Sequence, residues 1–403
     1  MVCRQIENEG IALNQRESKR PSPEPNLNET AHPVSNRLGY IDGMRGLAVA
    51  GVVLMHANTW GYAKAPWLHF LVLGRAGVDL FLVLSGFCLF LPLVKQGDGT
   101  VRELNLREYV HRRARRICPP YYAALVIAIA VCFLTYQFGG ASWWTEPFQT
   151  LFPLKGVSGV ADILTHATLT HGLVNRYAHG ISAPFWSLSL EVQFYALLPF
   201  LVLIARRYSV AWAILIPVIV SLLYRSWLFF FHRVVLSYYI GDEICVSRWV
   251  EFGMGMAAAV AVSSIAANAK SKFNSPAAIK IILLASVLVL AVVVGFESYD
   301  SHLFLLPFGW GAAFCLLIIS VQHSPPLKKL LEWKPLVALG TMSYSVYLIH
   351  DCVFRLFSIP LSRFTVSANL REILYYFIGI PITLLFSRLF FIKFEKPFMK
   401  ARS

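Results

Sequence analysis

Charged residues are scarce in this chain of 403 residues. Asp, Glu, Lys and Arg together make up 14% of it and hydrophobic residues 57%, whereas a typical soluble domain carries about 25% charged residues. So few charges exclude an ordinary soluble globular protein. The chain holds instead a series of apolar runs of about 20 residues, each long enough to cross a bilayer as a helix. The composition therefore predicts an all-α fold, a polytopic bundle of transmembrane helices.

Motifs for metal binding, disulfide formation and secretion are also lacking. The cysteines are scattered singly, with no CxxC pair and no Cys/His cluster at metal-ligand spacing. The sequence therefore indicates neither a disulfide framework nor a zinc site, and we expect no metal cofactor. The N-terminus has no short apolar segment with a small-residue cleavage site, which excludes a secretory signal. No internal repeat is visible, which weakens the case for a transporter built from inverted repeats.

Acidic residues are fewer than basic ones, 22 against 36, and the net charge is +14. Such a charge can indicate nucleic-acid binding. Here, however, the basic residues concentrate in linkers between apolar runs, as the positive-inside rule predicts, so we expect no nucleic-acid partner. The densest basic stretch, Lys95–Cys118, is predicted to be cytoplasmic. The N-terminus, two spans earlier, then lies on the same side.

We predict about ten spans with both termini cytoplasmic, in a multi-pass protein of the plasma (inner) membrane. Residues 1–38 are polar and rich in proline, and are expected to form a disordered cytoplasmic tail. Residues 39–398 are expected to form the transmembrane domain. The third span is expected to open at Pro119-Pro120, directly after the basic linker. The predicted spans are 40–60, 70–94, 119–138, 185–205, 209–231, 247–267, 279–296, 303–321, 336–357 and 371–392.

The first predicted span, YIDGMRGLAVAGVVLMHANTW, carries ionisable residues that an apolar span normally excludes. Arg45 lies near its start and His56 deep inside it, 11 residues later. Because 11 residues are close to three turns of 3.6 residues, both side chains lie on one face, about 16 Å apart along the axis. An ionisable group at this depth is costly and is a candidate functional group, and a histidine can act as general base or nucleophile. The alternative is structural, with Arg45 as a topology anchor and His56 as a hydrogen-bonding group in helix packing.

Two further stretches carry candidate functional groups. In HRRARRICPPYY, Arg113 and Arg116 lie three residues apart and face together on a helical turn. Guanidinium groups there can bind the phosphates of an anionic cofactor, although the stretch taken alone favours a simple topology signal. In FWSLSLEVQFYALLPF, Glu191 lies one or two turns inside the outer end of its span. A structural ion pair is the alternative for this carboxylate.

Other polar residues favour structural roles. Asp79 in the second span is expected to pair with an arginine, Arg45 or Arg75. His350 lies on a polar stripe of the ninth span, where a lone histidine is more often structural than catalytic. The spacing of the loop histidines is irregular and does not indicate a metal site; these are His166, His171 and His179.

In this order, the motifs resemble the acyltransferase-3 family of integral-membrane O-acyltransferases. The matching stretches run from residue 40 to 398, about nine-tenths of the chain, and follow the family order. They are YIDGMRGLAVAGVVLMHA, GVDLFLVLSGF, RRARRICPPYY, FWSLSLEVQFY, SYSVYLIH and FEKPF. Two small departures, Met44 for the usual leucine and Val192 where many members have a second glutamate, remove no proposed reacting group.

The resemblance implies transfer of an acyl group, commonly acetyl, from acyl-CoA to a hydroxyl of a glycan, glycolipid or glycosylated metabolite. By position, it implies His56 as the catalytic histidine and Arg45 as its motif partner. Arg113 and Arg116 match the family's paired arginines, and Glu191 its acidic position. Some members end in a soluble esterase-like domain, whereas this chain is expected to end soon after its last helix.

We therefore expect an O-acyltransferase whose partners are acyl-CoA, a hydroxyl-bearing glycan or glycoside acceptor, and the lipid bilayer. Arg113, Arg116 and Arg45 would bind the phosphates of acetyl-CoA or another acyl-CoA. His56 would deprotonate the acceptor hydroxyl or first take the acyl group itself, and Glu191 would orient the histidine or hold the acceptor. The alternative is a membrane transporter or flippase of a small anion or glycan without acyl chemistry. CoA release that depends on an acceptor distinguishes the enzyme from the transporter.

Overall fold

The computed structural model describes residues 38–61, 74–95, 100–138, 157–232, 244–267, 275–299, 304–362 and 367–399. Within these ranges the chain is helical, and the β pairing there is a single isolated bridge between Val94 and Val101. The all-α prediction is confirmed for this part of the chain. The tail predicted to be disordered lies outside the described residues, apart from its last position.

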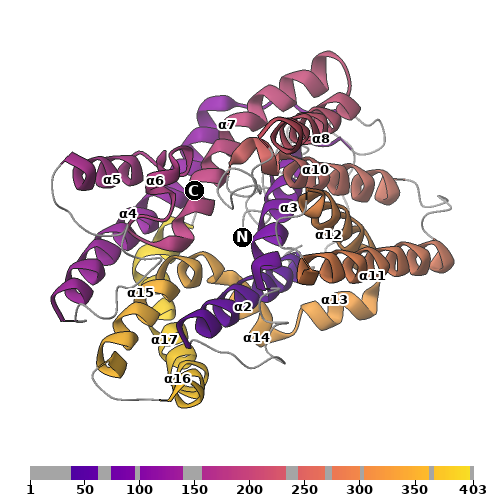
Figure 1. The fold of residues 1–403 in the computed structure, drawn as a ribbon. Coiled ribbons are helices and arrows are strands. Elements are labelled where there is room, and N and C mark those ends of the chain that lie inside the picture. The colour runs from indigo at the N-terminus through magenta and orange to yellow at the C-terminus, as the bar shows by residue number, and fades with distance from the viewer. Residues whose placement is uncertain are drawn as a thin grey trace, which may run out of the picture.

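The helices form one bundle with α2 near its centre (Figure 1). The first half of the chain supplies α2 (Gly39–Gly61), α3 (Ala76–Phe90), η2 (Leu91–Leu93), α4 (Leu106–Phe138), α5 (Val157–Ala167), η5 (His171–Leu173), α6 (Asn175–Ala178), η6 (Ala183–Phe185) and α7 (Trp186–Arg207). The second half supplies α8 (Val210–Trp227), the π-helix η7 (Leu228–His232), α10 (Cys245–Ala267), α11 (Pro276–Tyr299), α12 (Leu306–Gln322), α13 (Pro325–Leu331), α14 (Lys334–Thr341), α15 (Ser343–Ser362) and α16 (Ala368–Leu374). The last helix continues through η9 (Tyr375–Gly379), α17 (Ile380–Phe390), η10 (Phe391–Glu395) and η11 (Lys396–Phe398).

Seven of the described helices are long and apolar enough to cross a membrane, and two bent pairs raise the number to nine if each pair is one span. The pairs are α12 with α13, bent by 106°, and α14 with α15, bent by 75°. These nine correspond to nine of the ten predicted spans. The remaining one, α2, does not meet the same test, because Asp42, Arg45 and His56 lower its hydropathy. The multi-pass architecture is confirmed, whereas the count of ten and the side of the termini stay predictions.

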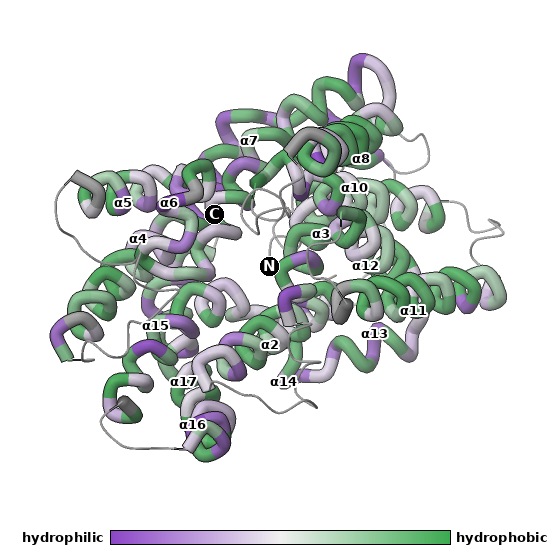
Figure 2. The backbone as a smooth tube through the Cα atoms, in the orientation of Figure 1, coloured by the Kyte–Doolittle hydropathy of each residue, from purple (hydrophilic) through white to green (hydrophobic). Residues whose placement is uncertain are grey.

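The exposed surface of α11 is apolar, as expected for a helix that faces lipid. Only 11% of the apolar window of this helix is buried inside the protein, and hydrophobic residues run along its whole length (Figure 2). Its outward face presents Ile281, Leu284, Val287, Leu288 and Val292. In water such a face would lose the hydrophobic free energy of burial. Such a face suits lipid, since a helix that is apolar all round and not buried in protein is typical of a membrane span.

The start of the third span was predicted wrongly. The helix α4 begins at Leu106 and continues through Pro119 and Pro120, rather than opening at the prolines. Each proline removes a backbone donor and costs the helix stability. Tight packing directly after them compensates, because Tyr121 and Ala124 are fully buried where α4 packs against α15. The basic stretch is therefore mostly the first half of a helix rather than a linker.

Glycines allow α2 to lie very close to α14. A β-carbon on Gly340 would stand 1.7 Å from the carbonyl oxygen of Asp42. On the α2 side, a β-carbon on Gly46 would stand 2.3 Å from the carbonyl oxygen of Leu336. Both obstacles are backbone atoms, which cannot turn away as a side chain can. The position of α2, and with it that of Arg45 and His56, depends on these two contacts.

Replacing Gly340 by alanine should therefore push α2 and α14 apart and lower the stability by about 1–3 kcal/mol, the usual cost of overpacking. Gly295→Ala is the matched control, because a β-carbon there meets nothing within 4 Å. Thermal unfolding of the detergent-solubilised protein measures both. Equal melting temperatures for the two variants would contradict the close approach.

Candidate active site

Two cavities lie along α2, and each takes one of the two basic residues predicted to be functional. The His56 cavity is lined by Val52, Met55, His56, Arg75, Val78, Asp79, His179, Ala183, Pro184, Trp186, Arg248, Leu306, Trp310 and Tyr347. The Arg45 cavity is lined by Arg45, Val78, Phe81, Leu82, Ser85, Arg116, Ile117, Ser187, Leu188, Glu191, Tyr195, Ser343, Tyr344 and Tyr347. Of these described residues only Val78 and Tyr347 line both cavities, so the two cavities meet at that pair.

An ion network from α3 and α10 forms one wall of the His56 cavity. The guanidinium of Arg248 lies 2.8 Å from an oxygen of Asp79 and 2.7 Å from an oxygen of Glu251. The side chains are almost completely buried, and each charge lies beside an opposite one, which is the condition for keeping charges out of water. Trp186 and Trp310 add aromatic surface to the same cavity. A ligand in this cavity therefore meets both apolar faces and hydrogen-bonding groups.

The ring of His350, on α15, contacts the ring of His56. The centroids of the two rings are 4.8 Å apart in an edge-to-face arrangement. The Nδ1 atom of His350 lies 2.8 Å from the carbonyl oxygen of Tyr347 and 3.2 Å from that of Val346. Because carbonyl oxygens only accept, these contacts assign the ring hydrogen to Nδ1. The Nε2 atom, buried and without a hydrogen-bond partner among the described residues, therefore carries a lone pair.

The carboxylate of Asp351, the residue after His350, forms its hydrogen bonds with groups other than the two histidines. Asp351 accepts hydrogen bonds from Trp60 at 3.1 Å, from Ser182 at 3.3 Å and from Arg355 at 3.1 Å. These bonds fix α15 against the end of α2 and the segment before α7. Asp351 therefore helps to fix the position of His350 through the backbone of α15, and does not form a hydrogen bond with its ring.

The Arg45 cavity combines two arginines with a carboxylate. Arg45 comes from α2, Arg116 from α4 and Glu191 from α7. Glu191 accepts a short hydrogen bond from the hydroxyl of Tyr195 and a longer one, at 3.5 Å, from Ser85. The cavity therefore offers planar cationic donors beside an oriented acid, which suits a ligand with anionic oxygens.

Arg113 does not line this cavity but lies next to it. Its guanidinium carbon is 5.8 Å from the ring centroid of Tyr109 and 5.7 Å from that of Tyr195. Both distances allow a cation–π contact. The hydroxyl of Tyr109 in turn donates to the carbonyl oxygen of Tyr195 at 3.0 Å. Of the predicted arginine pair, Arg116 thus faces the cavity and Arg113 stacks against its wall.

The C-terminal FEKPF motif supports the same region. Glu395 is 3% exposed and accepts hydrogen bonds from the amide of Ser345, at 3.1 Å, and from its hydroxyl. Ser345 lies in the first turn of α15, where backbone amides have no helical partner and a carboxylate is favourable. Glu395 therefore caps the helix that carries Tyr347 and His350.

The structure separates residues that the sequence grouped together. Arg45 and His56 both face Val78 and Tyr347, which agrees with their placement on one face of α2, but they line different cavities. Glu191 lies with Arg45 rather than with His56. Arg248 was missed as a partner of Asp79, although an arginine and Glu251 three residues apart in an apolar span are a signal that could have identified it.

A family model described as an acyltransferase domain matches residues 38–392. The chain belongs to the acyltransferase-3 family. The match includes α2, both cavities and all five residues predicted to be functional. It confirms the resemblance on which the expected chemistry depends.

Two curated relatives are O-acetyltransferases. The peptidoglycan O-acetyltransferase OatA of Listeria monocytogenes is 26% identical over 379 residues, which cover 89% of this chain and 55% of that protein. The O-acetyltransferase OatA of Staphylococcus aureus is 26% identical over 326 residues, 77% of this chain and 49% of that protein. The acyltransferase domain thus spans about half the length of these relatives. No solved structure matches the chain.

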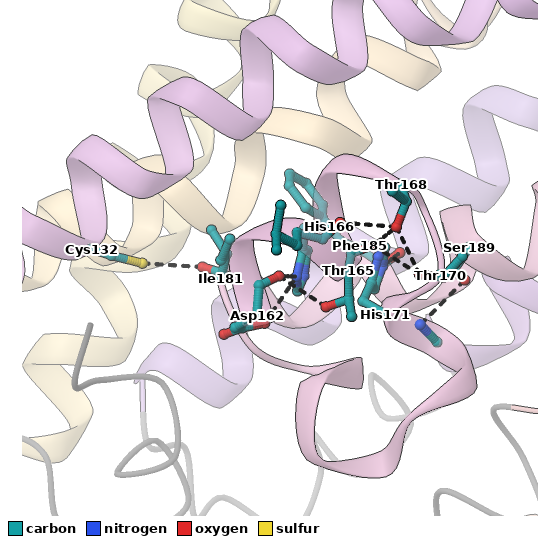
Figure 3. A network of polar contacts seen from close by, with 12 residues as sticks. Cys132, Asp162, Thr165, His166, Thr168, Thr170, His171, Ile181, Phe185 and Ser189 are labelled. Carbon is teal, nitrogen blue, oxygen red and sulfur yellow. Dashed lines mark hydrogen bonds and ion pairs between the residues drawn. The ribbon is translucent and has the colours of Figure 1, made fainter. Parts of the chain in front are cut away.

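In this acyltransferase domain two of the loop histidines, His166 and His171, hold a segment in place, whereas His179 lines the His56 cavity. The rings of His166 and His171 are stacked, with centroids 4.0 Å apart and planes 5° from parallel (Figure 3). His166 lies 3.0 Å from a carboxylate oxygen of Asp162, and Nε2 of His171 lies 2.9 Å from the carbonyl oxygen of Phe185. Both rings are fully buried. Among the described residues no group of three or more His, Cys, Asp or Glu could hold a metal ion.

Acid should loosen this segment. Burial, followed by the nearby charge of His166, lowers the pKa of His171 to about 3, whereas an unfolded histidine has a pKa of about 6.5. Between these values the unfolded segment binds a proton that the folded one does not. Stability is therefore complete above about pH 6.5 and is lost as the pH falls below it, by up to about 1.4 kcal/mol per pH unit.

Hydrogen exchange of residues 159–185 at pH 7.5 and pH 5, corrected for intrinsic rates, measures this loss. His171→Gln keeps a donor for the carbonyl of Phe185 but does not titrate, and should show less pH dependence. Unchanged protection of the wild-type segment at pH 5 would contradict the buried neutral histidine.

Proposed function

We propose that this chain is a membrane-bound O-acyltransferase that moves an acetyl or other short acyl group from acyl-CoA to a hydroxyl of a glycan, glycolipid or glycosylated metabolite. One observation carries the proposal. A cavity lined by Arg45 and Arg116 and a second cavity lined by His56 lie along the same helix and meet at Val78 and Tyr347. This arrangement provides one place for an anionic acyl donor and another for the acceptor.

The donor is assigned to the Arg45 cavity. Arg45 and Arg116 can bind phosphate oxygens of CoA with two parallel hydrogen bonds each, and Arg113 adds positive charge beside them. Glu191 with Tyr195 and Ser85 keeps the site from being purely cationic and can orient Arg45. The basic first half of α4 favours the cytoplasmic side of a plasma (inner) membrane for this cavity, which is where acyl-CoA would enter.

The chemistry is assigned to His56. Its imidazole takes the proton of the acceptor hydroxyl, and the oxygen bonds to the thioester carbonyl carbon. The carbon–sulfur bond breaks, CoA leaves as the thiolate, and the imidazolium returns the proton to the sulfur. In the alternative order His56 first takes the acyl group from sulfur and then passes it to the hydroxyl. In both orders the lone pair on Nε2 of His350 can accept a hydrogen bond from His56 and orient the ring.

The relatives support a glycan as the acceptor. The Listeria protein is named for O-acetylation of peptidoglycan, a hydroxyl-bearing glycan. The walls of the His56 cavity fit a sugar, since Trp186 and Trp310 offer aromatic faces and Asp79 with Arg248 offers hydrogen-bonding groups. A proposed glycan acceptor also agrees with the position of His56, which lines the cavity on the other side of Tyr347 from Arg45 and Arg116.

Replacing His56 by alanine should lower acyl transfer at least 100-fold, the contribution typical of a general base. The assay mixes solubilised protein with acetyl-CoA and glycan acceptors, and follows both free CoA and the acylated product. His111→Ala, an exposed position on α4, is the matched control and should retain activity. Transfer by a folded His56→Ala protein would refute the assignment, and acceptor uptake without CoA release would favour a transporter.

Replacing Arg45 or Arg116 by alanine should raise the KM for acyl-CoA about 10- to 100-fold, because each loses a charge-assisted hydrogen bond of about 1.5–3 kcal/mol. The KM for the acceptor should change little. Arg206→Ala is the control, since this arginine forms only a half-exposed ion pair with Glu103, at 3.4 Å. A selective rise in the acceptor KM would place the donor in the other cavity.

A further inference from the structure

Tyr347 occupies the boundary between the two cavities. It lines both of them, as does Val78 on the facing helix α3. Tyr347 is 7% exposed, and its ring lies 6.3 Å from that of Phe81 and 5.7 Å from that of His350, measured between centroids. The side chain is therefore held by packing on the donor side and beside the histidines.

The hydroxyl of Tyr347 joins one residue from each cavity. It donates to the carbonyl oxygen of Pro184, at 2.7 Å, and lies 2.6 Å from the hydroxyl of Ser187. Pro184 lines the His56 cavity and Ser187 the Arg45 cavity. Since one hydroxyl carries one hydrogen, the bond to Pro184 makes Tyr347 the acceptor from Ser187. The two bonds fix the ring across the junction.

We propose that Tyr347, together with Val78, is a partition whose narrow opening is filled by the acyl group of a bound donor on its way to His56, so that water does not reach the donor thioester through the junction. Tyr347 is thus a specificity-determining residue, which selects the acceptor hydroxyl over water. This inference rests on the proposed acyl transfer. It adds a property that neither the arginines nor His56 can supply, because both would serve hydrolysis equally well.

The need for a partition follows from the chemistry. A base beside a thioester activates any hydroxyl within reach, and water is the smallest and most abundant one. With water as nucleophile, its oxygen bonds to the carbonyl carbon, the carbon–sulfur bond breaks, and a free carboxylic acid and CoA are released. Enzymes prevent this loss by closing the site against solvent. A buried aromatic ring held by two hydrogen bonds is such a closure.

Removing the ring should therefore uncouple CoA release from acyl transfer. The full chain in detergent is supplied with acetyl-CoA and no acceptor, and free CoA and acetate are measured. Tyr347→Ala should release CoA at least 10-fold faster than the wild type under these conditions. Tyr347→Phe keeps the ring but loses both hydrogen bonds, and should raise the release only two- to threefold. Adding His56→Ala to Tyr347→Ala should abolish the extra release, which shows that the leak uses the same site.

Tyr344→Ala is the matched control. Tyr344 lies one turn earlier on the same helix and lines the Arg45 cavity only, so its loss can weaken donor binding but should not speed hydrolysis. If Tyr347→Ala fails to fold, Val78→Ala enlarges the junction from the facing helix and should also raise acceptor-free release.

The outcomes distinguish the partition from the proposed function. Acyl transfer by the wild type, with no faster acceptor-free release in Tyr347→Ala or Val78→Ala, overturns the partition and leaves the acyltransferase intact. An equal rise in Tyr344→Ala also overturns it, because the leak would then come from general loosening of α15. If the wild type neither transfers the acyl group nor releases CoA with acceptor present, the proposed function itself fails.

Discussion

The cost of burying charge in an apolar bundle governs this structure. Each buried ionic group in the described helices has opposite charges or hydrogen-bonding groups beside it, since an unpaired charge there would be strongly destabilising. Arg248 lies between Asp79 and Glu251, and Asp351 contacts Arg355. Arg225, fully buried, donates to the carbonyl of Phe304 at 2.6 Å and to Ser247 at 2.7 Å. The contacts of Arg248 tie α3 to α10, and those of Arg225 tie α8 to α10.

The candidate functional residues differ from these paired groups because their side chains line cavities. His56 meets the ring of His350 on one side and a cavity on the other. Arg45 and Arg116 face a second cavity with Glu191. The hydrogen bond from Trp60 of α2 to Asp351 of α15 helps to hold the helix that carries His56 and Arg45, and a held helix gives the positioning that catalysis needs. The framework and the candidate site are thus built from the same kind of interaction.

The sequence allowed the spans to be predicted where a single physical signal dominates. Long apolar runs gave α7, α8, α10 and α11 nearly to their ends, because lipid requires a continuous apolar helix. The start of α4 was missed, since Pro119-Pro120 normally ends or begins a helix and only packing keeps it continuous. The breaks in the bent pairs, near Ser324 and Met342, could not be predicted, because they depend on how neighbouring helices meet.

The site shows the same limit at the level of single residues. Spacing along one helix predicted that Arg45 and His56 share a face, but it carries no information about residues on other helices. That Tyr347 contacts Pro184 and Ser187, more than 150 residues away in sequence, is a property of the packed bundle alone. Yet this contact divides one apparent site into two cavities. The proposed reaction therefore depends as much on what separates donor from acceptor as on the groups that react, because a base and a thioester together, without a barrier to water, would catalyse hydrolysis.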